Sequence, residues 1–219
     1  MIIKSFQLNQ TNIEKFNFFM FYGPNSGLQN EIIENFFAKR FEEVINKYDE
    51  NEIIRNREII ISEMMSKSLF DNKKIYIISR VSEKILNFIL EILEKKIDSV
   101  KIILKSKSLD KRSKLRTFFE KDKLLVTIPV YEDTPQDLSK IIIKFLNENK
   151  IKLSMESINL LISRARGDRD NIKNELNKIL SYSFTKKSVS FEAVKKLSNL
   201  SENFSVSELV DNYLSKKTS

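Results

Sequence analysis

Cysteine and histidine are both absent from the 219 residues of this sequence. Without cysteine the chain forms no disulfide bonds and carries out no thiolate chemistry, so a cytoplasmic location is expected. Without histidine it lacks the commonest general base and the commonest metal ligand. These absences exclude histidine-based catalytic triads and zinc sites made of thiolates or imidazoles, while catalysis by carboxylates stays open.

Long hydrophobic runs are missing as well. No apolar run reaches the roughly 18 residues that a membrane-spanning helix requires, so no membrane partner is expected. Residues 1–16 are mixed and polar and do not resemble a signal peptide. Hydrophobic residues nevertheless make up 41% of the chain, which is enough for the cores of one or two domains.

Positive charge is concentrated in one segment. The chain has a net charge of +8, and residues 101–117 contain seven basic side chains and a single acid. The potential of each charge decays over a Debye length, so only charges that lie close together reinforce one another. A cluster of basic side chains can therefore attract phosphate groups. Two interpretations stay open for this segment, namely contact with nucleic acid and an ordinary solvated face.

Short apolar runs alternate with helical patterns between residues 17 and 134. The runs predicted to be strands lie at 17–22, 52–55 (a weak one), 74–79, 100–104 and 124–128. Helices are predicted between them, including one around 58–65, one capped by Ser82 and a basic one at 109–121. Apolar strands separated by helices are typical of a parallel sheet covered on both faces. The sequence therefore predicts an α/β domain over residues 1–134.

The pattern becomes purely helical after residue 134. Thr134 and Pro135 open a helix, Thr134 as the predicted cap and Pro135 in the first turn. Further helices are predicted to begin near Ser154, Gly167 and Ser190. Residues 135–200 therefore read as a small helical bundle, and a capping box at Ser205 predicts one more helix within residues 201–219.

A glycine-bounded turn between a strand and a helix has the layout of a nucleotide-binding phosphate loop. The turn consists of Gly23, Pro24, Asn25, Ser26 and Gly27. A working loop continues with a lysine for the phosphates and a serine or threonine for magnesium, whereas Leu28 and Gln29 follow here. The loop is also one residue too short. The sequence therefore predicts a degenerate, non-functional loop, no catalytic residues and no cofactor.

The ends of the later predicted strands also lack a residue that ATP hydrolysis requires. A hydrolysing site needs an acidic residue there to position magnesium and water. The strands predicted at 74–79 and 100–104 run instead into Arg80 and Lys105. We therefore expect a non-hydrolysing relative of the ATPases, although the turn taken alone favours an ordinary strand–turn–helix.

Four motifs, in order, resemble the delta subunit of the bacterial DNA polymerase III clamp loader. They are YGPNSGL at 22–28, SLF at 68–70, LDKRSKLRTFFE at 109–120 and GDRDNIKNELNKI at 167–179. The likeness covers nearly the whole chain. It implies an AAA+-like P-loop-type domain at 1–134, a helical lid domain at 135–200 and, at 201–219, the start of a collar domain that is otherwise missing. It also implies a non-catalytic subunit of a DNA-directed DNA polymerase complex.

The resemblance implies that an exposed apolar pair, Leu69 and Phe70, grips the β sliding clamp. Ser68, Met65 and Met64 belong to the same short segment. An apolar pair bracketed by polar residues can fill a partner's pocket, and adaptable methionines suit its rim. Without the resemblance, a second interpretation is favoured, in which the pair is buried at the end of a helix, because most large apolar side chains are buried.

Further partners are implied by the same resemblance. They are the ATPase subunits gamma or tau, the delta prime subunit and primed DNA. Candidate contacts to DNA or to a neighbouring subunit are Lys107, Lys111, Arg112, Lys114 and Arg116, the last four expected on one helix. Rival functions are an active P-loop NTPase, a free-standing DNA-binding protein and a structural adaptor with an ATPase-like fold.

Overall fold

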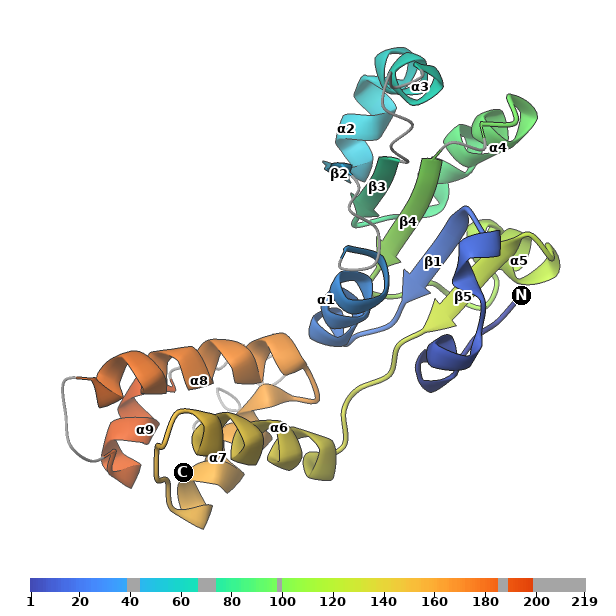
Figure 1. The fold of residues 1–219 in the computed structure, drawn as a ribbon. Coiled ribbons are helices and arrows are strands. Elements are labelled where there is room, and N and C mark those ends of the chain that lie inside the picture. The colour runs from blue at the N-terminus through green and yellow to red at the C-terminus, as the bar shows by residue number, and fades with distance from the viewer. Residues whose placement is uncertain (39–43, 67–73, 98–99, 185–188, 199–219) are drawn as a thin grey trace, which may run out of the picture. The chain divides into compact units, whose positions relative to one another are not determined.

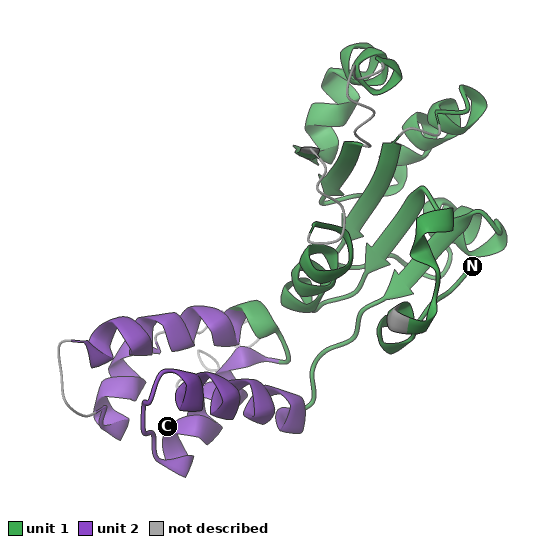
Figure 2. Cartoon of the chain, viewed as in Figure 1, with its two compact units in different colours: residues 1–134, 167–170 green, residues 135–166, 171–219 purple. Residues whose placement is uncertain are grey.

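The computed structural model describes residues 1–38, 44–66, 74–97, 100–184 and 189–198, which form two compact units (Figure 2). Unit 1 comprises residues 1–134 and 167–170. Unit 2 comprises residues 135–166 and the chain from Asn171 onward. Within the described ranges, no helix has both the length and the apolar character needed to cross a bilayer.

Unit 1 is built on a five-stranded, all-parallel sheet with the strand order β2-β3-β4-β1-β5 (Figure 1). The strands are β1 (Phe18–Tyr22), β2 (Val44–Asp49), β3 (Lys74–Ser79), β4 (Val100–Ser106) and β5 (Leu125–Pro129). All except β2 coincide, to within two residues at each end, with the predicted apolar runs. Strands covered on both faces are continuously apolar, which makes them visible in sequence. The predicted α/β fold is confirmed.

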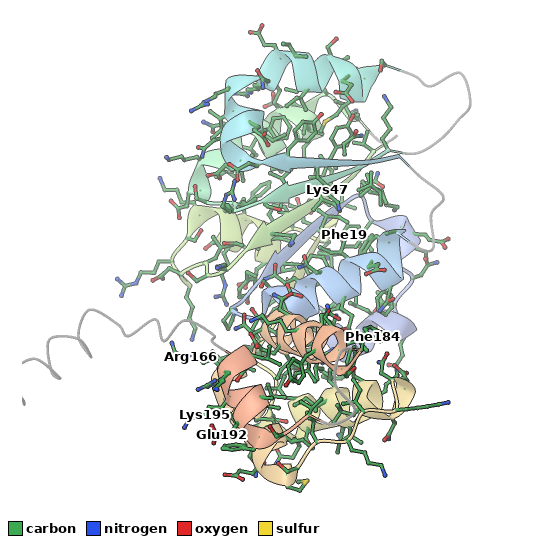
Figure 3. All side chains as sticks on the ribbon, turned by 90° about the vertical axis from the view of Figure 1, so that its left-hand side faces the viewer. Phe19, Lys47, Arg166, Phe184, Glu192 and Lys195 are labelled. Atoms are coloured by element: carbon green, nitrogen blue, oxygen red, sulfur yellow. The ribbon has the colours of Figure 1, made fainter. Side chains whose placement is uncertain are left out.

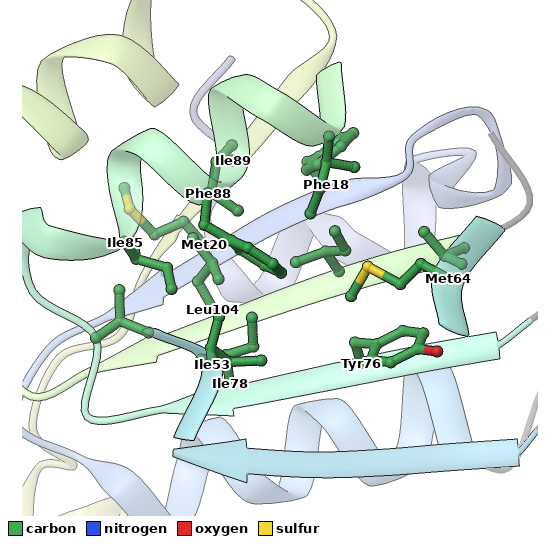
Figure 4. Close-up of a cluster of buried hydrophobic side chains, with 14 of the residues drawn as sticks. Phe18, Met20, Ile53, Met64, Tyr76, Ile78, Ile85, Phe88, Ile89 and Leu104 are labelled. Carbon is green, nitrogen blue, oxygen red and sulfur yellow. The ribbon is translucent and has the colours of Figure 1, made fainter. Parts of the chain in front are cut away.

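Four helices cover one face of this sheet. They are α2 (Glu50–Arg55), α3 (Arg57–Met65), α4 (Leu86–Glu94) and α5 (Lys114–Lys121). Their apolar sides bury Met20, Tyr76 and Leu104 of the strands beneath Ile53 and Phe88 of the helices (Figure 4). Burying each large apolar side chain contributes about 1.5–3 kcal/mol, so this cluster is a major source of stability.

The other face is covered by α1 (Ser26–Ile33), by the π-helical turn η3 (Glu34–Ala38) and by the N-terminal turns η1 (Ser5–Gln10) and η2 (Ile13–Lys15). Phe37 of η3 meets the ring of Phe19 edge to face, with ring centroids 4.7 Å apart. Ile32 and Ile33 of α1 are buried in the same cluster. This packing holds the end of α1 and the turn η3 against the sheet.

The edge strand β2 is where the predicted pattern fails. The predicted strand at 52–55 is wrong, because these residues belong to α2. Asp49 accepts a hydrogen bond from the backbone N–H of Asn51 at 3.0 Å, and Glu52 accepts one from that of Asp49 at 2.6 Å. This capping box starts a helix. The true strand carries polar residues such as Lys47, so its apolar signal is weak.

Unit 2 contains helices joined by short loops, and no strand occurs among its described residues. Its helices are α6 (Pro135–Glu148), α7 (Met155–Ala165), α8 (Arg169–Ser183), of which the first two residues belong to unit 1, and α9 (Phe191–Leu197). They enclose a separate core of buried residues that includes Leu138, Ile142, Leu161, Leu176 and Val194. Exposed charges such as Glu192 and Lys195 of α9 lie on its surface (Figure 3).

The caps predicted at Ser154 and Ser190 are confirmed. Ser154 accepts a hydrogen bond from the N–H of Ser157 at 3.2 Å, and Ser190 accepts one from that of Ala193 at 3.2 Å. Pro135 opens α6 as expected. The helix predicted after the capping box at Ser205 lies outside the described residues.

Candidate functional site

The turn after β1 is shaped by its packing against β4 and the end of β5. The N–H of Gly23 donates to the carbonyl oxygen of Ser106 at 3.2 Å. Gly23 has a φ of +140°, and a Cβ atom there would lie 1.7 Å from the carbonyl oxygen of Val130. Only glycine fits this close approach between backbones.

Asn25 joins the turn to α1 and to the segment after β5. Its side chain is completely buried, and its Oδ1 accepts a hydrogen bond from the N–H of Leu28 at 2.9 Å, which caps α1. Its Nδ2 donates to Oδ2 of Asp133 at 2.8 Å. The side chain is therefore engaged on both sides.

The residues that replace the lysine and the hydroxyl of a working loop serve the fold. Leu28 is half-buried and packs against the apolar cluster beneath α1. Gln29 is 2% exposed, and its Nε2 donates to the carbonyl oxygens of Gly23 and Ser106, both at 3.0 Å. An aliphatic and a buried amide side chain therefore stand where phosphate and magnesium ligands would be required.

A carboxylate of the chain itself accepts the hydrogen bonds that such a loop offers to a phosphate. The N–H of Gly27 donates to Oδ1 of Asp168 at 3.1 Å, and the hydroxyl of Ser26 donates to its Oδ2 at 3.0 Å. The N–H of Asp170 also donates to Oδ1, at 2.9 Å. Backbone N–H groups at the start of a helix form a ready anion site, and here Asp168 is the anion.

Arg169 holds this arrangement through two carboxylates. Its Nε and Nη2 donate to Oδ2 and Oδ1 of Asp133 at 2.6 and 2.8 Å, and its Nη1 donates to Oε1 of Glu31 at 2.8 Å. The side chain of Asp133 is 5% exposed and that of Arg169 is 19% exposed. Two-pronged arginine–carboxylate pairs are among the stronger ionic contacts, and this pair fixes the residue next to Asp168.

The acidic side chain at the end of β2 also has partners within the chain. Asp49 ends β2 and forms a salt bridge with Arg80, which follows β3. The backbone hydrogen bond from Asn51 is the main cause that lowers the pKa of Asp49, and Arg80 lowers it further. In the part of the chain that the structure describes, no three acidic side chains gather into a possible metal site.

No protein-family model and no curated protein matches the sequence. Among solved structures, the Thermotoga maritima RuvB Holliday junction branch migration motor matches with a TM-score of 0.62 and 13% identity, over 88% of this chain and 65% of that chain. Domain III of the Thermotoga maritima replication initiation protein DnaA matches with a TM-score of 0.51 and 14% identity, over 88% and 87%.

A Bacillus subtilis DNA clamp loader delta protein (YqeN) aligns with a TM-score of 0.48 and 13% identity, over 88% of this chain and 62% of that chain. That score is too low to support an argument. The matches to RuvB and DnaA establish the fold. The chain has an AAA+-type fold. It spans less than two thirds of the RuvB structure's length, at 65%.

The basic segment of this AAA+-type fold differs from the prediction. Lys111 and Arg112 do not lie on the helix, because α5 begins at Lys114. Ser113 caps α5, and the side chain of Asp110 accepts a hydrogen bond from the N–H of Arg112 at 2.8 Å. These local side-chain contacts form a turn before the helix, and the single basic helix over 109–121 is a wrong prediction.

Two cations of this segment are engaged inside unit 1. Arg116 donates to Oε1 of Glu120 at 2.8 Å and stands 4.5 Å over the ring of Tyr22. Lys101 is 1% exposed and donates to the carbonyl oxygen of Phe16 at 2.8 Å. Both side chains therefore have partners within unit 1. Exposed cations of the segment are Lys107, Lys111, Arg112 and Lys114.

The proposed clamp element is described only in part. Leu69, Phe70 and Ser68 lie outside the described residues. Met65 is 55% exposed at the end of α3. Met64 is 1% exposed and packs in the core beneath α3 (Figure 4), so its assignment to an exposed rim needs correction. The helical spacing turns Met64 toward the sheet and Met65 away from it.

Sequence reasoning missed the three residues that complete the loop, namely Asp133, Asp168 and Arg169. Some indication of them was present in the sequence, because Asp133 follows the last predicted strand. Asp168 and Arg169 directly follow Gly167 in the motif at 167–179. Their partnership could not be read from spacing, since Asp168 and Gly27 are 141 residues apart. Only the fold brings them together.

Proposed function

We propose that the chain is a delta-type subunit of a bacterial clamp loader, which binds and opens the β sliding clamp for loading onto primed DNA. The observation that carries the proposal is an AAA+-type fold whose phosphate loop is filled by Asp168. A module with this shape and without the phosphate-binding lysine suits a role that does not hydrolyse ATP. The four motifs that resemble the delta family select the clamp as the partner.

The proposed mechanism is mechanical. Leu69 and Phe70 insert into a pocket on the clamp, near the seam between its subunits. Binding opens the ring only if the element has a higher affinity for the open form than for the closed form, because a ligand shifts an equilibrium by its differential affinity. The ATPase subunits gamma or tau supply the energy of ATP hydrolysis, and delta prime completes the loader.

Clamp capture tests the proposal directly. The parent chain, Leu69→Ala, Phe70→Ala and the control Met155→Ala are each titrated with the β clamp of the same bacterium. Met155 is an apolar residue of unit 2 that is 65% exposed. Because anchors of this kind contribute about 2 kcal/mol or more, each mutation in the pair should weaken binding by about thirtyfold. The control should bind like the parent, and circular dichroism should show all four folded.

Equal clamp affinity of all four chains would contradict the proposal. The four exposed cations at 107–114 favour one second candidate, a DNA-binding protein without a clamp partner. That candidate requires tight binding of DNA by the isolated chain, with a steep dependence on salt. A chain that binds duplex DNA and fails to capture the clamp would establish it.

A further inference from the structure

A cavity with a volume of about 370 Å³ lies between α1, η3 and the strands β2, β3 and β4. Pockets that bind small molecules start at about 300 Å³, so this cavity has room for a compact ligand. Its lining includes Ser79, the last residue of β3, and Lys105, near the end of β4. The turn at 23–27 is not part of its lining, so the cavity is distinct from the phosphate loop.

The floor of the cavity is apolar. It consists of Ile33 of α1, Ile45 of β2 and Ile77 of β3. Ile33 and Ile77 are 5% and 7% exposed, so they are part of the core beneath α1. A flat phosphate-binding surface would not need such a floor, whereas a ligand with an apolar body would be stabilised by it.

Two lysines stand over this floor. Lys47 of β2 (labelled in Figure 3) pairs in register with Ile77, and Lys105 comes from β4. The Nζ of Lys105 donates to Oδ1 of Asn30, and Ser79 adds a hydroxyl group to the lining. The cavity therefore offers two cations and a neutral donor around an apolar base.

The charge of Lys105 is incompletely balanced. Burial lowers the pKa of Lys105, the charge of Asp170 opposes this, and the nearby charge of Lys47 lowers the pKa further. Glu34 is the one carboxylate among the described lining residues. An anion between the two lysines would relieve their mutual repulsion and compensate the cost of burying the ammonium group.

We propose that this cavity binds a small phosphorylated molecule, with its phosphate between Lys47 and Lys105 and its compact apolar part on Ile33, Ile45 and Ile77. A phosphate group offers acceptor oxygens to both ammonium groups, in addition to the charge that Asp170 already supplies to Lys105. A nucleic acid backbone would use the lysines and leave the isoleucine floor uncovered. The proposal is independent of the clamp-loader function.

Methyl NMR tests the site without a functional assay. The full chain, labelled at isoleucine methyl groups, is titrated with phenyl phosphate, with inorganic phosphate and with the uncharged benzyl alcohol. Phenyl phosphate should cause saturable shifts at Ile33, Ile45 and Ile77 and none at Ile158 of unit 2. Inorganic phosphate should bind more weakly at the same place, and benzyl alcohol should bind most weakly of the three.

Three variants assign the binding to the lysines. Lys105→Gln and Lys47→Gln should each weaken phenyl phosphate about tenfold, because each removes one charged contact. Lys152→Gln, a change at an exposed lysine of unit 2, should leave the affinity unchanged. The same methyl spectra report whether each variant is folded, and Lys47, at the exposed rim, tests the site even if Lys105→Gln unfolds.

Several results would overturn the inference. They are the absence of saturable shifts, equal affinity for benzyl alcohol, or unchanged affinity in both lysine variants. A single-stranded oligonucleotide is titrated in parallel. If it alone shifts the three methyl groups, the lysines serve nucleic acid and the small-ligand proposal is wrong. Clamp capture is unaffected by any of these outcomes, so the two proposals succeed or fail separately.

Discussion

The N–H of Gly27 and the hydroxyl of Ser26 both belong to the first turn of α1, where backbone N–H groups have no acceptor within the helix. In a nucleotide-binding protein a phosphate fills this need. Here Asp168 fills it, at 3.1 and 3.0 Å. The loop keeps its shape because its donors are satisfied, although the lysine and magnesium ligands are gone.

Replacing Asp168 by alanine should therefore destabilise unit 1. A donor that loses its acceptor in a partly buried site costs about 1–3 kcal/mol, so the free energy of unfolding should fall by about that amount. Asp168→Asn keeps an acceptor oxygen and should cost less. Urea denaturation measures both changes.

Glu94→Ala is the matched control for this comparison. Glu94 is an exposed acid at the end of α4, and its removal should change the free energy of unfolding by less than about 0.5 kcal/mol. If Asp168→Ala is as stable as Glu94→Ala, the loop does not depend on its internal carboxylate.

A tyrosine pair and one glutamate join three elements at the edge of the sheet. The rings of Tyr48 (β2) and Tyr76 (β3) stack with centroids 6.2 Å apart. Both hydroxyl groups donate to Glu63 of α3, at 3.5 Å from Tyr48 and 3.3 Å from Tyr76. Burial raises the pKa of both tyrosines, and the charge of Glu63 raises each further. The packing of α3 on β2 and β3 is therefore coupled to protonation.

This coupling predicts how stability changes in alkali. Above a pH of about 10 an unfolded tyrosine loses its proton while the folded Tyr76 keeps it. The folded state then binds more protons, so the free energy of unfolding falls as pH rises, whereas below that pH Tyr76 contributes no slope. Urea denaturation from pH 8 to pH 11 should show a shallower fall for Tyr76→Phe than for the parent. Parallel curves would contradict the assignment.

How far the elements could be predicted depended on their burial. The strands β1, β3, β4 and β5 are covered on both faces and appear as apolar runs, whereas the edge strand β2 carries Asn46 and Lys47 and was missed. The start of α5 was misplaced, because Ser113 caps the helix while Asp110, an equally good capping residue, accepts a hydrogen bond from the N–H of Arg112 in the turn before it. The missing lysine was enough to predict a degenerate loop from the sequence. The hydrogen bonds from the loop to Asp168 could not be predicted, because only the fold brings these residues together.

At the scale of the whole molecule, the chain joins an AAA+-type sheet unit to a small helical unit, each with its own core. The parallel sheet of the AAA+-type fold is present, whereas Leu28, Gln29 and Asp168 occupy the loop in place of phosphate- and magnesium-binding groups. Under the proposed function, such a chain acts mechanically within an assembly whose other subunits use ATP.

The filled phosphate loop can be observed through the three glycines of the sequence, all of which lie in or beside it: Gly23, Gly27 and Gly167. A chain labelled with ¹⁵N-glycine gives one amide signal for each, and Lys105→Gln in the same chain removes any contribution of the cavity. Addition of magnesium and ATP is predicted to leave the signals of Gly23 and Gly27 unmoved and to release no phosphate. A saturable shift of these two signals, or steady release of phosphate by the purified chain, would contradict the account.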